Sequence, residues 1–170
     1  MRVGKTLISE RRIRRRVREL GAQITSDYHG KNLALLGALN GSVCFMADLM
    51  REISLPLNIH FIRISSYRGT QPGEIELNSE FDSDLSGKHV LIVEDIVDTG
   101  ATVEFIVGRI SRLGAKSVEI CSFLDKPSQR VHPVEIRYTG FQIPDAFVVG
   151  YGLDYDGLYR NLPHVAILEE

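Results

Sequence analysis

The chain has 170 residues, of which 44% are hydrophobic and 25% are charged, and its formal net charge at pH 7 is −2. This length is that of one domain with a substantial core, and the composition matches an ordinary soluble globular protein. The near-neutral charge argues against a general electrostatic grip on nucleic acid, and no uncharged apolar run approaches the length of about 18 residues that a membrane span requires.

Two cysteines, Cys44 and Cys121, both lie inside apolar runs. This setting predicts reduced core residues rather than a disulfide, and no metal-ligand spacing links them. The N-terminus has no uninterrupted apolar segment of the kind found in signal peptides. We therefore predict a cytoplasmic protein without membrane association.

The first predicted element is a helix that follows the expected N-cap Ser9 and ends near Tyr28. Its apolar residues recur with helical spacing at Ile13, Val17, Leu20 and Ile24. Six arginines between Arg11 and Arg18 crowd the other faces. Such a run is compatible with RNA binding, but it is typical of a solvated face, and Glu10 and Glu19 dilute its charge.

Residues 33–39, LALLGAL, predict a buried strand, and the loop Asn40-Gly41-Ser42 then leads into a second helix. The apolar side of this helix is expected to carry Val43, Met46, Leu49, Met50 and Ile53. The N–H group of Gly41 and the hydroxyl of Ser42 lie where an anion could bind, although any helix needs a cap.

Residues 58–65 alternate like a strand, and the polar segment 66–73, SYRGTQPG, predicts a mobile loop. Residues 74–77 are expected to return as a short strand, which makes the loop the tip of a hairpin. This loop is either a plain surface loop or a lid that excludes water from an unstable intermediate.

The stretch from His89 to Thr102 carries the strongest functional signal. Four apolar residues, 90–93, predict a buried strand that stops at Glu94 and Asp95, and Asp98 follows a little later. Helical spacing begins at Val103 and continues through Ile106, Val107, Ile110 and Leu113. The segment is therefore predicted as strand, polar loop and helix.

Ligands bind at the carboxyl ends of strands in open parallel sheets, and a helix N-terminus offers free N–H groups to an anion. The small residues Thr99, Gly100, Ala101 and Thr102 thus predict a phosphate-binding loop. Carboxylates beside a phosphate would repel it, so we expect them to bind sugar hydroxyls or a divalent cation, or to act as a base. The alternative is an acidic turn in which the glycine serves geometry alone.

The rest of the chain predicts further strands at residues 117–124, 138–143, 146–151 and 164–168. Lys126 follows the first of these, and a tail rich in aromatic and turn-forming residues covers 152–160. The five histidines lie far apart, without metal or triad spacing, which disfavours a catalytic histidine.

These segments together resemble a known family. VLIVEDIVDTGAT (90–102) is similar to the phosphoribosyl-diphosphate-binding signature of type I phosphoribosyltransferases. SSYRGT (65–70), LDKP (124–127), IPDAFVVGYGLDYDGLYRNLPHVAIL (143–168) and TLISERRIRRRVRELGAQI (6–24) resemble the bacterial-type hypoxanthine-guanine branch. The similarity runs from about Leu7 to Leu168.

The resemblance implies an α/β fold, a single domain over residues 1–170 with a mostly parallel central sheet flanked by helices. A core of about 30–125 would carry a small hood built from the N-terminal segment and about 126–170. The implied reaction transfers a 5-phosphoribosyl group from phosphoribosyl diphosphate to N9 of hypoxanthine or guanine, with Mg²⁺ as cofactor. The implied assembly is a homodimer or homotetramer, and a nucleic-acid partner is not expected.

The resemblance also implies site residues within the central motif. Glu94 and Asp95 match the positions that engage the ribose hydroxyls, with a metal close by. Asp98 matches a carboxylate near N7 of the purine, as general base or stabiliser of the N7 proton. Residues 99–102 match the 5′-phosphate loop.

Outside that motif, Lys126 matches the donor to the purine O6, Phe147 the ring that stacks on the base, and Val148 a source of main-chain contacts. Asp154 matches a metal ligand, and Arg160 a cation for the leaving diphosphate. Without the family match, Phe147 reads as a core residue, Arg160 as a surface charge and Asp154 as a turn residue.

The loops supply the remaining implied roles. Ser66 and Tyr67 match the dipeptide that a lid brings over the reacting centre. Asn40 and Gly41 match the diphosphate loop, but the family usually carries Lys or Arg where this chain has Asn40. Diphosphate contact there should therefore rest on backbone N–H groups, through a non-proline cis peptide as the family implies.

Two rival functions remain open. One is a related transferase that prefers xanthine. The other is a regulator that keeps this fold to sense phosphoribosyl diphosphate and binds nucleic acid through the arginine-rich helix. Retention of Asp98, Lys126 and the Ser66-Tyr67 pair disfavours the regulator.

Overall fold

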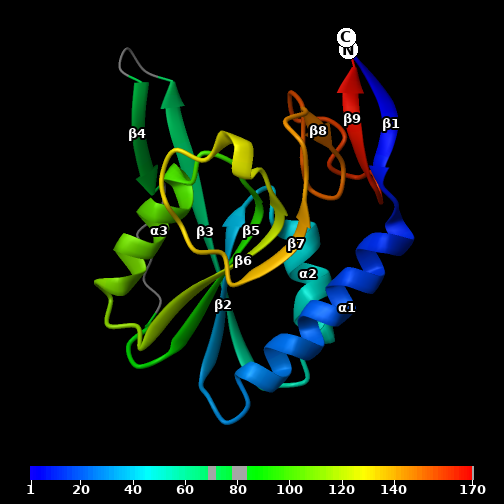
Figure 1. The fold of residues 1–170 in the computed structure, drawn as a ribbon. Helices are drawn as coiled ribbons and strands as arrows, with labels where there is room; N and C mark the ends of the chain where they lie inside the picture. The colour runs from blue at the N-terminus through cyan, green and yellow to red at the C-terminus, as the bar shows by residue number, and fades with distance from the viewer. Residues whose placement is uncertain (69–71, 78–83, 170) are drawn as a thin grey trace.

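A computed structural model describes residues 1–68, 72–77 and 84–169, with the backbone alone for residues 65–68 and 72–77. Within these residues, the strands form a six-stranded sheet and a separate three-stranded sheet. Helices α1 and α2 cover one face of the larger sheet and α3 covers the other (Figure 1). The predicted α/β class, a mostly parallel sheet flanked by helices, is confirmed.

The larger sheet has the strand order β4-β3-β2-β5-β6-β7, in which β4 alone is antiparallel to its neighbour. Its strands are β2 (Leu33–Leu39), β3 (Leu57–Arg68), β4 (Pro72–Leu77), β5 (His89–Val97), β6 (Ser117–Asp125) and β7 (Tyr138–Gln142). β3 and β4 follow β2 on one side of the sheet, and β6 and β7 follow β5 on the other side. The order therefore reverses between β2 and β5, and such a switch point opens a crevice at the carboxyl ends of the strands.

The helices are α1 (Glu10–Asp27), α2 (Val43–Glu52) and α3 (Ala101–Ser111), followed by a short 3₁₀ helix, η1 (Pro127–Gln129). The predicted apolar stripe of α1 is confirmed, since its four residues are all buried. Gly21 lets α1 approach α2 closely, because a Cβ at this position would lie 2.5 Å from Cβ of Glu52. On α2, Phe45, Met46 and Leu49 are buried, whereas Val43 was wrongly predicted for the core and is 42% exposed.

The apolar core lies on both faces of the larger sheet. One part packs α1 and α2 against β2, β5 and β6, and it includes the buried thiol of Cys121. The other part packs α3 against the opposite faces of β2, β3 and β5. Cys44 is partly buried, and both cysteines are free, as predicted.

The smaller sheet has the order β1-β9-β8 and joins the two ends of the chain (Figure 1). Its strands are β1 (Arg2–Ile8), β8 (Val148–Val149) and β9 (Val165–Glu169). β1 was not predicted. β8 is shorter than the predicted strand 146–151, because Gly150, Tyr151 and Gly152 have positive φ angles and turn the chain. β7, in the segment expected for the hood, pairs with β6 in the larger sheet.

The hairpin of β3 and β4 is longer than predicted. Residues 66–68 and 72–73 were expected in a loop, but their backbone belongs to the two strands, and Ser66 pairs with Ile75. The inter-strand pairing therefore continues past the expected end of the strand at Ser65. The remainder of the predicted tip, residues 69–71, lies outside the described residues.

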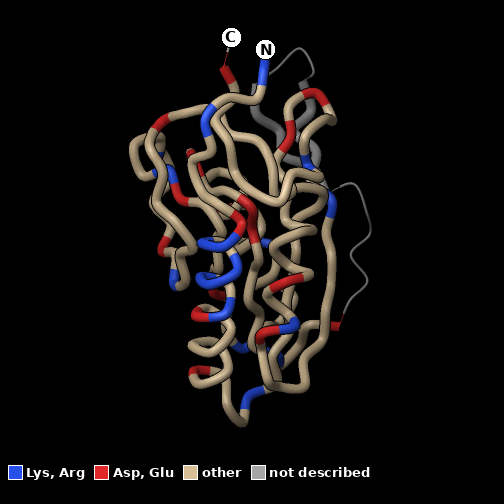
Figure 2. The backbone as a smooth tube through the Cα atoms, turned by 90° about the vertical axis from the view of Figure 1, so that its right-hand side faces the viewer, with Lys and Arg blue, Asp and Glu red and all other residues tan. Residues whose placement is uncertain are grey.

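The arginines of α1 lie among acidic groups on one side of the molecule (Figure 2). Arg14 pairs with Glu10 at 2.5 Å, and Arg16 pairs with Glu19 at 3.0 Å. Arg16 also donates to the backbone carbonyl groups of Thr139 and Gly140, so it holds α1 against β7. Part of the arginine run therefore serves the fold. No helix in the described part of the chain is long and apolar enough to cross a membrane.

Candidate active site

A polar cavity of about 230 Å³ lies at the switch point between β2 and β5. It brings together the end of β2, the end of β5, the first turn of α3 and the C-terminal tail. Its lining residues are Ala38, Leu39, Gly41, Ile64, Glu94, Asp95, Thr102, Asp154 and Arg160. Six of the predicted site residues, far apart in the sequence, thus share one cavity.

Gly41 is the point where three segments meet. A Cβ at Gly41 would lie 1.6 Å from Oδ2 of Asp95, and a Cβ at Gly152 would lie 2.1 Å from the carbonyl oxygen of Gly41. The loop after β2 is therefore packed between β5 and the C-terminal tail. Only glycine at positions 41 and 152 allows this close approach.

The carboxylate pair lies deeper than predicted. β5 does not stop at Glu94 but continues to Val97, since Glu94 pairs with Ser122 and Val97 with Asp125 of β6. Glu94 is 6% exposed, and its buried Oε2 has no hydrogen-bond partner among the described residues. Burial, together with the charges of Asp95 and Asp98, raises the pKa of Glu94 well above its ordinary value. An unpaired buried carboxylate oxygen is a group that a ligand would satisfy.

Asp95 accepts a hydrogen bond from its neighbour, the Ile96 N–H, at 2.9 Å, but burial dominates and raises its pKa to about 6. Because the folded state keeps the proton more tightly, it binds more protons than the unfolded state between pH 3.8 and about 6. This carboxyl therefore lowers the stability of the ligand-free protein as the pH rises through that interval.

We expect Asp95→Asn to stabilise the ligand-free protein above pH 6 by about 1–3 kcal/mol, because it removes a buried charge. Thermal unfolding measured from pH 4 to 8 should show a smaller decline for the variant than for the unchanged protein. An unchanged pH dependence would show that Asp95 is not the destabilising group.

The loop from Asp98 to Thr102 has the geometry of an anion site. Gly100 is the N-cap of α3 with φ +88°, a conformation that favours glycine. Oδ1 of Asp98 accepts from the Thr99 N–H at 2.6 Å, and Oγ1 of Thr99 accepts from the Ala101 N–H at 3.4 Å. Thr102 lies in the first turn of α3 and faces the cavity. The predicted helix start at Val103 was two residues late.

The sequence did not predict the hydrogen bonds that hold this loop from behind. Arg130 donates to the carbonyl oxygens of Asp98 at 2.9 Å and Val97 at 3.3 Å, and it forms an ion pair with the buried Asp125. The N–H groups of Val131 and His132 both donate to the Thr99 carbonyl, at 3.0 and 2.8 Å. With its carbonyl groups held from behind, the loop keeps its orientation. No spacing in the sequence connects Arg130 to a loop 32 residues away.

Lys126 lies beside Asp98 at the ends of neighbouring strands. Val97 pairs with Asp125, and the Lys126 N–H donates to the Val97 carbonyl at 2.9 Å. The Lys126 side chain is 13% exposed, with Nζ 3.9 Å from Oδ1 of Asp145. Asp98 and Lys126, two of the residues predicted to contact the base, are therefore brought together at the carboxyl ends of β5 and β6.

Phe147 is not a core residue, because it is 55% exposed and its ring meets Tyr155 edge-on at 5.7 Å. Val148 is buried in β8 and pairs with Ile167. An exposed aromatic ring next to a buried strand leaves one ring face for a planar ligand.

Asp154 and Arg160 meet at the cavity in an ion pair of 2.6 Å. Oδ2 of Asp154 also accepts from the Gly157 N–H at 2.8 Å, and Arg160 donates to the Gly152 carbonyl at 2.5 Å. The tail is thus folded so that one carboxylate and one guanidinium face the carboxylates of β5. Among the described residues, no group of three or more His, Cys, Asp or Glu side chains forms a metal site by itself.

The loop after β2 differs from the prediction in one respect. The hydroxyl of Ser42 was expected to be available to an anion, but Ser42 is fully buried and donates to the Ala38 carbonyl at 2.7 Å. The peptide bond between Leu39 and Asn40 is cis, as the resemblance implies. Ser66 and Tyr67 lie near the end of β3, where the structure describes the backbone alone.

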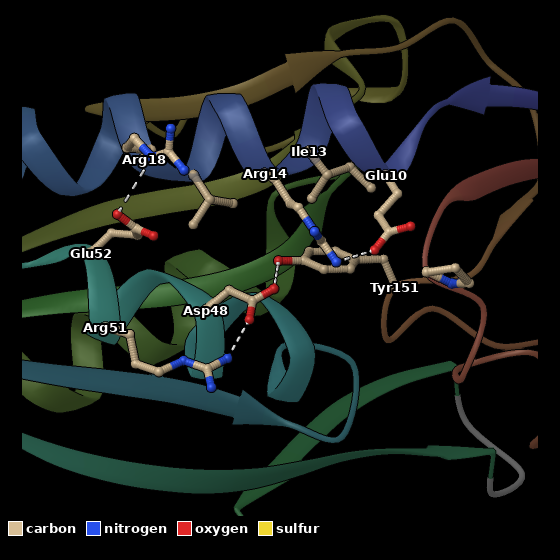
Figure 3. A pocket seen from close by; sticks show the side chains of 10 residues that line it. Glu10, Ile13, Arg14, Arg18, Asp48, Arg51, Glu52 and Tyr151 are labelled. Atoms are coloured by element: carbon tan, nitrogen blue, oxygen red, sulfur yellow. Dashed lines mark hydrogen bonds and ion pairs between the residues drawn. The ribbon is translucent and has the colours of Figure 1, made fainter.

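A second and larger cavity, about 460 Å³, lies between α1 and α2 (Figure 3). Its charged groups satisfy one another: Arg51 pairs with Asp48 at 2.5 Å, and Asp48 also accepts from the Tyr151 hydroxyl at 2.7 Å. Arg18 and Glu52 are 4.0 Å apart across it. The unsatisfied carboxylate lies in the other cavity, so we assign the chemistry there.

The sheet order, the buried carboxylate pair and the braced loop at the start of α3 define a type I phosphoribosyltransferase. Comparison with known proteins agrees, since the family described as "Phosphoribosyl transferase domain" matches residues 5–156. The hypoxanthine-guanine phosphoribosyltransferase of Streptococcus pneumoniae is 45% identical over 170 residues, covering 99% of this chain and 94% of the relative.

Solved structures give the same result. A crystal structure of a hypoxanthine phosphoribosyltransferase from Staphylococcus aureus superposes with a TM-score of 0.94 at 44% identity, covering 98% of this chain and 92% of the other. That of Trypanosoma cruzi, in complex with the product IMP, has a TM-score of 0.92 at 37% identity, covering 98% and 95%. The chain belongs to the phosphoribosyl transferase family and, within it, to the hypoxanthine-guanine phosphoribosyltransferases.

Proposed function

We propose that this enzyme serves purine salvage by transferring the 5-phosphoribosyl group of phosphoribosyl diphosphate to N9 of hypoxanthine or guanine. The products are IMP or GMP and diphosphate. The observation that carries the proposal is the cavity at the switch point, which unites the loop after β2, the carboxylates of β5, the start of α3 and the tail. The carboxylates, the guanidinium and the helix start that line it support a ligand that carries both hydroxyl and phosphate groups.

The sugar end of the substrate fits the centre of this cavity. We propose that Glu94 and Asp95 accept hydrogen bonds from the ribose hydroxyls. The unpaired, buried Oε2 of Glu94 supports this proposal, because a ligand hydroxyl would satisfy it. The 5′-phosphate is proposed to bind Thr99, Gly100, Ala101 and Thr102 through the N–H groups and hydroxyls at the start of α3.

The purine is proposed to lie between Asp98, Lys126 and Phe147. Asp98 would take up or hold the N7 proton, Lys126 would donate to O6, and Phe147 would stack on the ring. Main-chain groups of Val148 would contact its edge. The adjacency of Asp98 and Lys126 at neighbouring strand ends supports this arrangement.

Mg²⁺ is the proposed cofactor, and the residues present fit it. Glu94, Asp95 and Asp154 offer the oxygen ligands that this ion prefers, and Mg²⁺ is usually bound by one or two carboxylates together with substrate phosphates. When bound, the ion would neutralise charge on the departing diphosphate. Asn40, Gly41 and Arg160 are proposed to contact that diphosphate, with Arg160 exchanging its bond to Asp154 for one to the anion.

Three proposals rest on the sequence and the family alone. Ser66 and Tyr67 are proposed to close over the reacting centre, which would keep water from an oxocarbenium-like state. The hood is proposed to comprise the N-terminal segment and part of the chain after residue 126. We further propose a cytoplasmic homodimer or homotetramer.

An assay with phosphoribosyl diphosphate and Mg²⁺ against hypoxanthine, guanine, xanthine, adenine, uracil and orotate tests the function. We expect turnover of hypoxanthine and guanine. Preference for xanthine would reassign the substrate, and RNA or DNA binding at physiological salt without turnover of any base would favour a regulator.

Lys126→Ala tests the selection of 6-oxopurines. Adenine carries an exocyclic amine where hypoxanthine has O6, and an amine cannot accept a hydrogen bond from an ammonium group. We therefore expect the ratio of kcat/KM for hypoxanthine over adenine to fall about 10- to 100-fold. Lys116→Ala, a change at an exposed lysine on the loop before β6, is the matched control. If the variant still rejects adenine fully, O6 is recognised elsewhere.

A further inference from the structure

Arg63 lies beside Asn40, the residue of the loop after β2 at which this chain lacks the basic side chain that the resemblance implies. Leu39, the last residue of β2, is paired with Arg63, which lies in the middle of β3. From this position Arg63 reaches across the strand pair, and its Nη2 donates to Oδ1 of Asn40 at 3.4 Å. A guanidinium group from the next strand thus lies where this chain has an amide in the loop itself.

The charge of the cavity makes this guanidinium relevant. Among the described residues, three carboxylates line the cavity, those of Glu94, Asp95 and Asp154, against the one guanidinium of Arg160. Arg160 is itself paired with Asp154. A diphosphate group carries several negative charges, so binding it at this cavity calls for additional positive charge.

Arg63 is able to provide that charge. Its side chain is exposed, and no carboxylate in the described part of the chain forms an ion pair with it. The hydrogen bond to the neutral Asn40 orients the guanidinium without neutralising it. Ile64, the next residue of β3, lines the cavity, so this part of β3 borders the site, and Arg63 reaches it through the loop after β2, where it contacts Asn40.

We propose that Arg63 is a substrate-binding residue that supplies, from β3, the positive charge missing at position 40. Its guanidinium contacts the diphosphate group of phosphoribosyl diphosphate and the diphosphate that leaves. Asn40 is the residue that holds it in place. This inference rests on the proposed function and extends it to a position outside the family's motifs.

Arg63→Gln should weaken the substrate interactions at this end of the site. We expect KM for phosphoribosyl diphosphate and the inhibition constant of inorganic diphosphate with Mg²⁺ to rise about 5- to 30-fold, with KM for hypoxanthine unchanged. Arg63→Lys should retain most of the affinity. Arg112→Gln, a change at an exposed arginine at the end of α3, is the matched control and should change neither constant.

A second variant restores the charge at the other position. Asn40→Lys on the Arg63→Gln background should recover most of the lost diphosphate affinity, an effect that a purely structural role of Arg63 would not give. Binding of inorganic diphosphate with Mg²⁺, measured calorimetrically, provides a readout independent of turnover. Thermal unfolding of each variant shows that the fold is retained.

Different results would refute the proposed function and the role of Arg63. Failure of the unchanged protein to turn over any 6-oxopurine refutes the proposed function. If the unchanged protein is active but Arg63→Gln leaves diphosphate binding unaltered, or raises KM for both substrates alike, the role of Arg63 is refuted. Absence of recovery in the double variant would likewise overturn it.

Discussion

Asp98→Asn should lower kcat about 10²- to 10⁴-fold, the range expected for loss of a positioned acid-base group. The amide keeps an oxygen that can accept from the Thr99 N–H, as Asp98 does at 2.6 Å, so the phosphate loop should keep its shape. We therefore expect the dissociation constant of phosphoribosyl diphosphate to change less than threefold, an order-of-magnitude estimate for an undisturbed contact. Stopped-flow single-turnover kinetics and equilibrium binding measure the two quantities separately.

Asp84→Asn provides a matched control for this variant. Asp84 is also an exposed aspartate whose Oδ1 accepts from a nearby backbone N–H, that of Ser86 at 3.0 Å, but it lies in the loop before β5, away from the cavity residues. Its variant should behave like the unchanged protein. Equal losses of kcat and of phosphoribosyl diphosphate affinity in Asp98→Asn would instead mean that Asp98 shapes the loop and does not act on the base.

Gly41→Ala should cost at least about 10²-fold in kcat/KM, the effect of displacing a reacting group by roughly 1 Å. The new methyl group would lie 1.6 Å from Oδ2 and 2.4 Å from Cγ of Asp95, so this side chain or the loop has to move. The space on the other side is closed as well, because Gly152 packs against the Gly41 carbonyl. Steady-state kinetics with phosphoribosyl diphosphate as the varied substrate measure the loss.

Gly108→Ala is the control, since a Cβ at Gly108 of α3 meets nothing within 4 Å. This change should leave the kinetics unaltered and stabilise the helix by up to about 1 kcal/mol. Near-normal activity in Gly41→Ala would show that the contact between Gly41 and Asp95 is not needed for catalysis.

Short-range patterns predicted the elements well where the signal is local. β2 has the predicted bounds, Leu33–Leu39, because a run of apolar residues buried on both faces has clear ends. The stripe of α1 also follows directly from helical spacing.

Elements that depend on distant partners were predicted less well. β1 has no alternating pattern and forms because Arg2 lies opposite Glu169 and Ile8 opposite Val165, at the other end of the chain. β5 runs through its carboxylates because β6 supplies partners as far as Asp125. Strand ends of this kind depend on register with a neighbour, and the sequence of one strand does not contain that register.

The sequence by itself determined the chemical groups of the site and the family. Carboxylates, a glycine and hydroxyls follow one another between a buried strand and a helix, and this local order is enough to predict a phosphate-binding loop beside a group of carboxylates. Only the tertiary structure decided which groups meet. The order of strands and their register bring Gly41 against Asp95, Arg130 behind the phosphate loop and Arg63 beside Asn40, whereas the Ser42 hydroxyl turns inward. Contacts between segments far apart in the chain depend on strand pairing and packing, which no local pattern specifies.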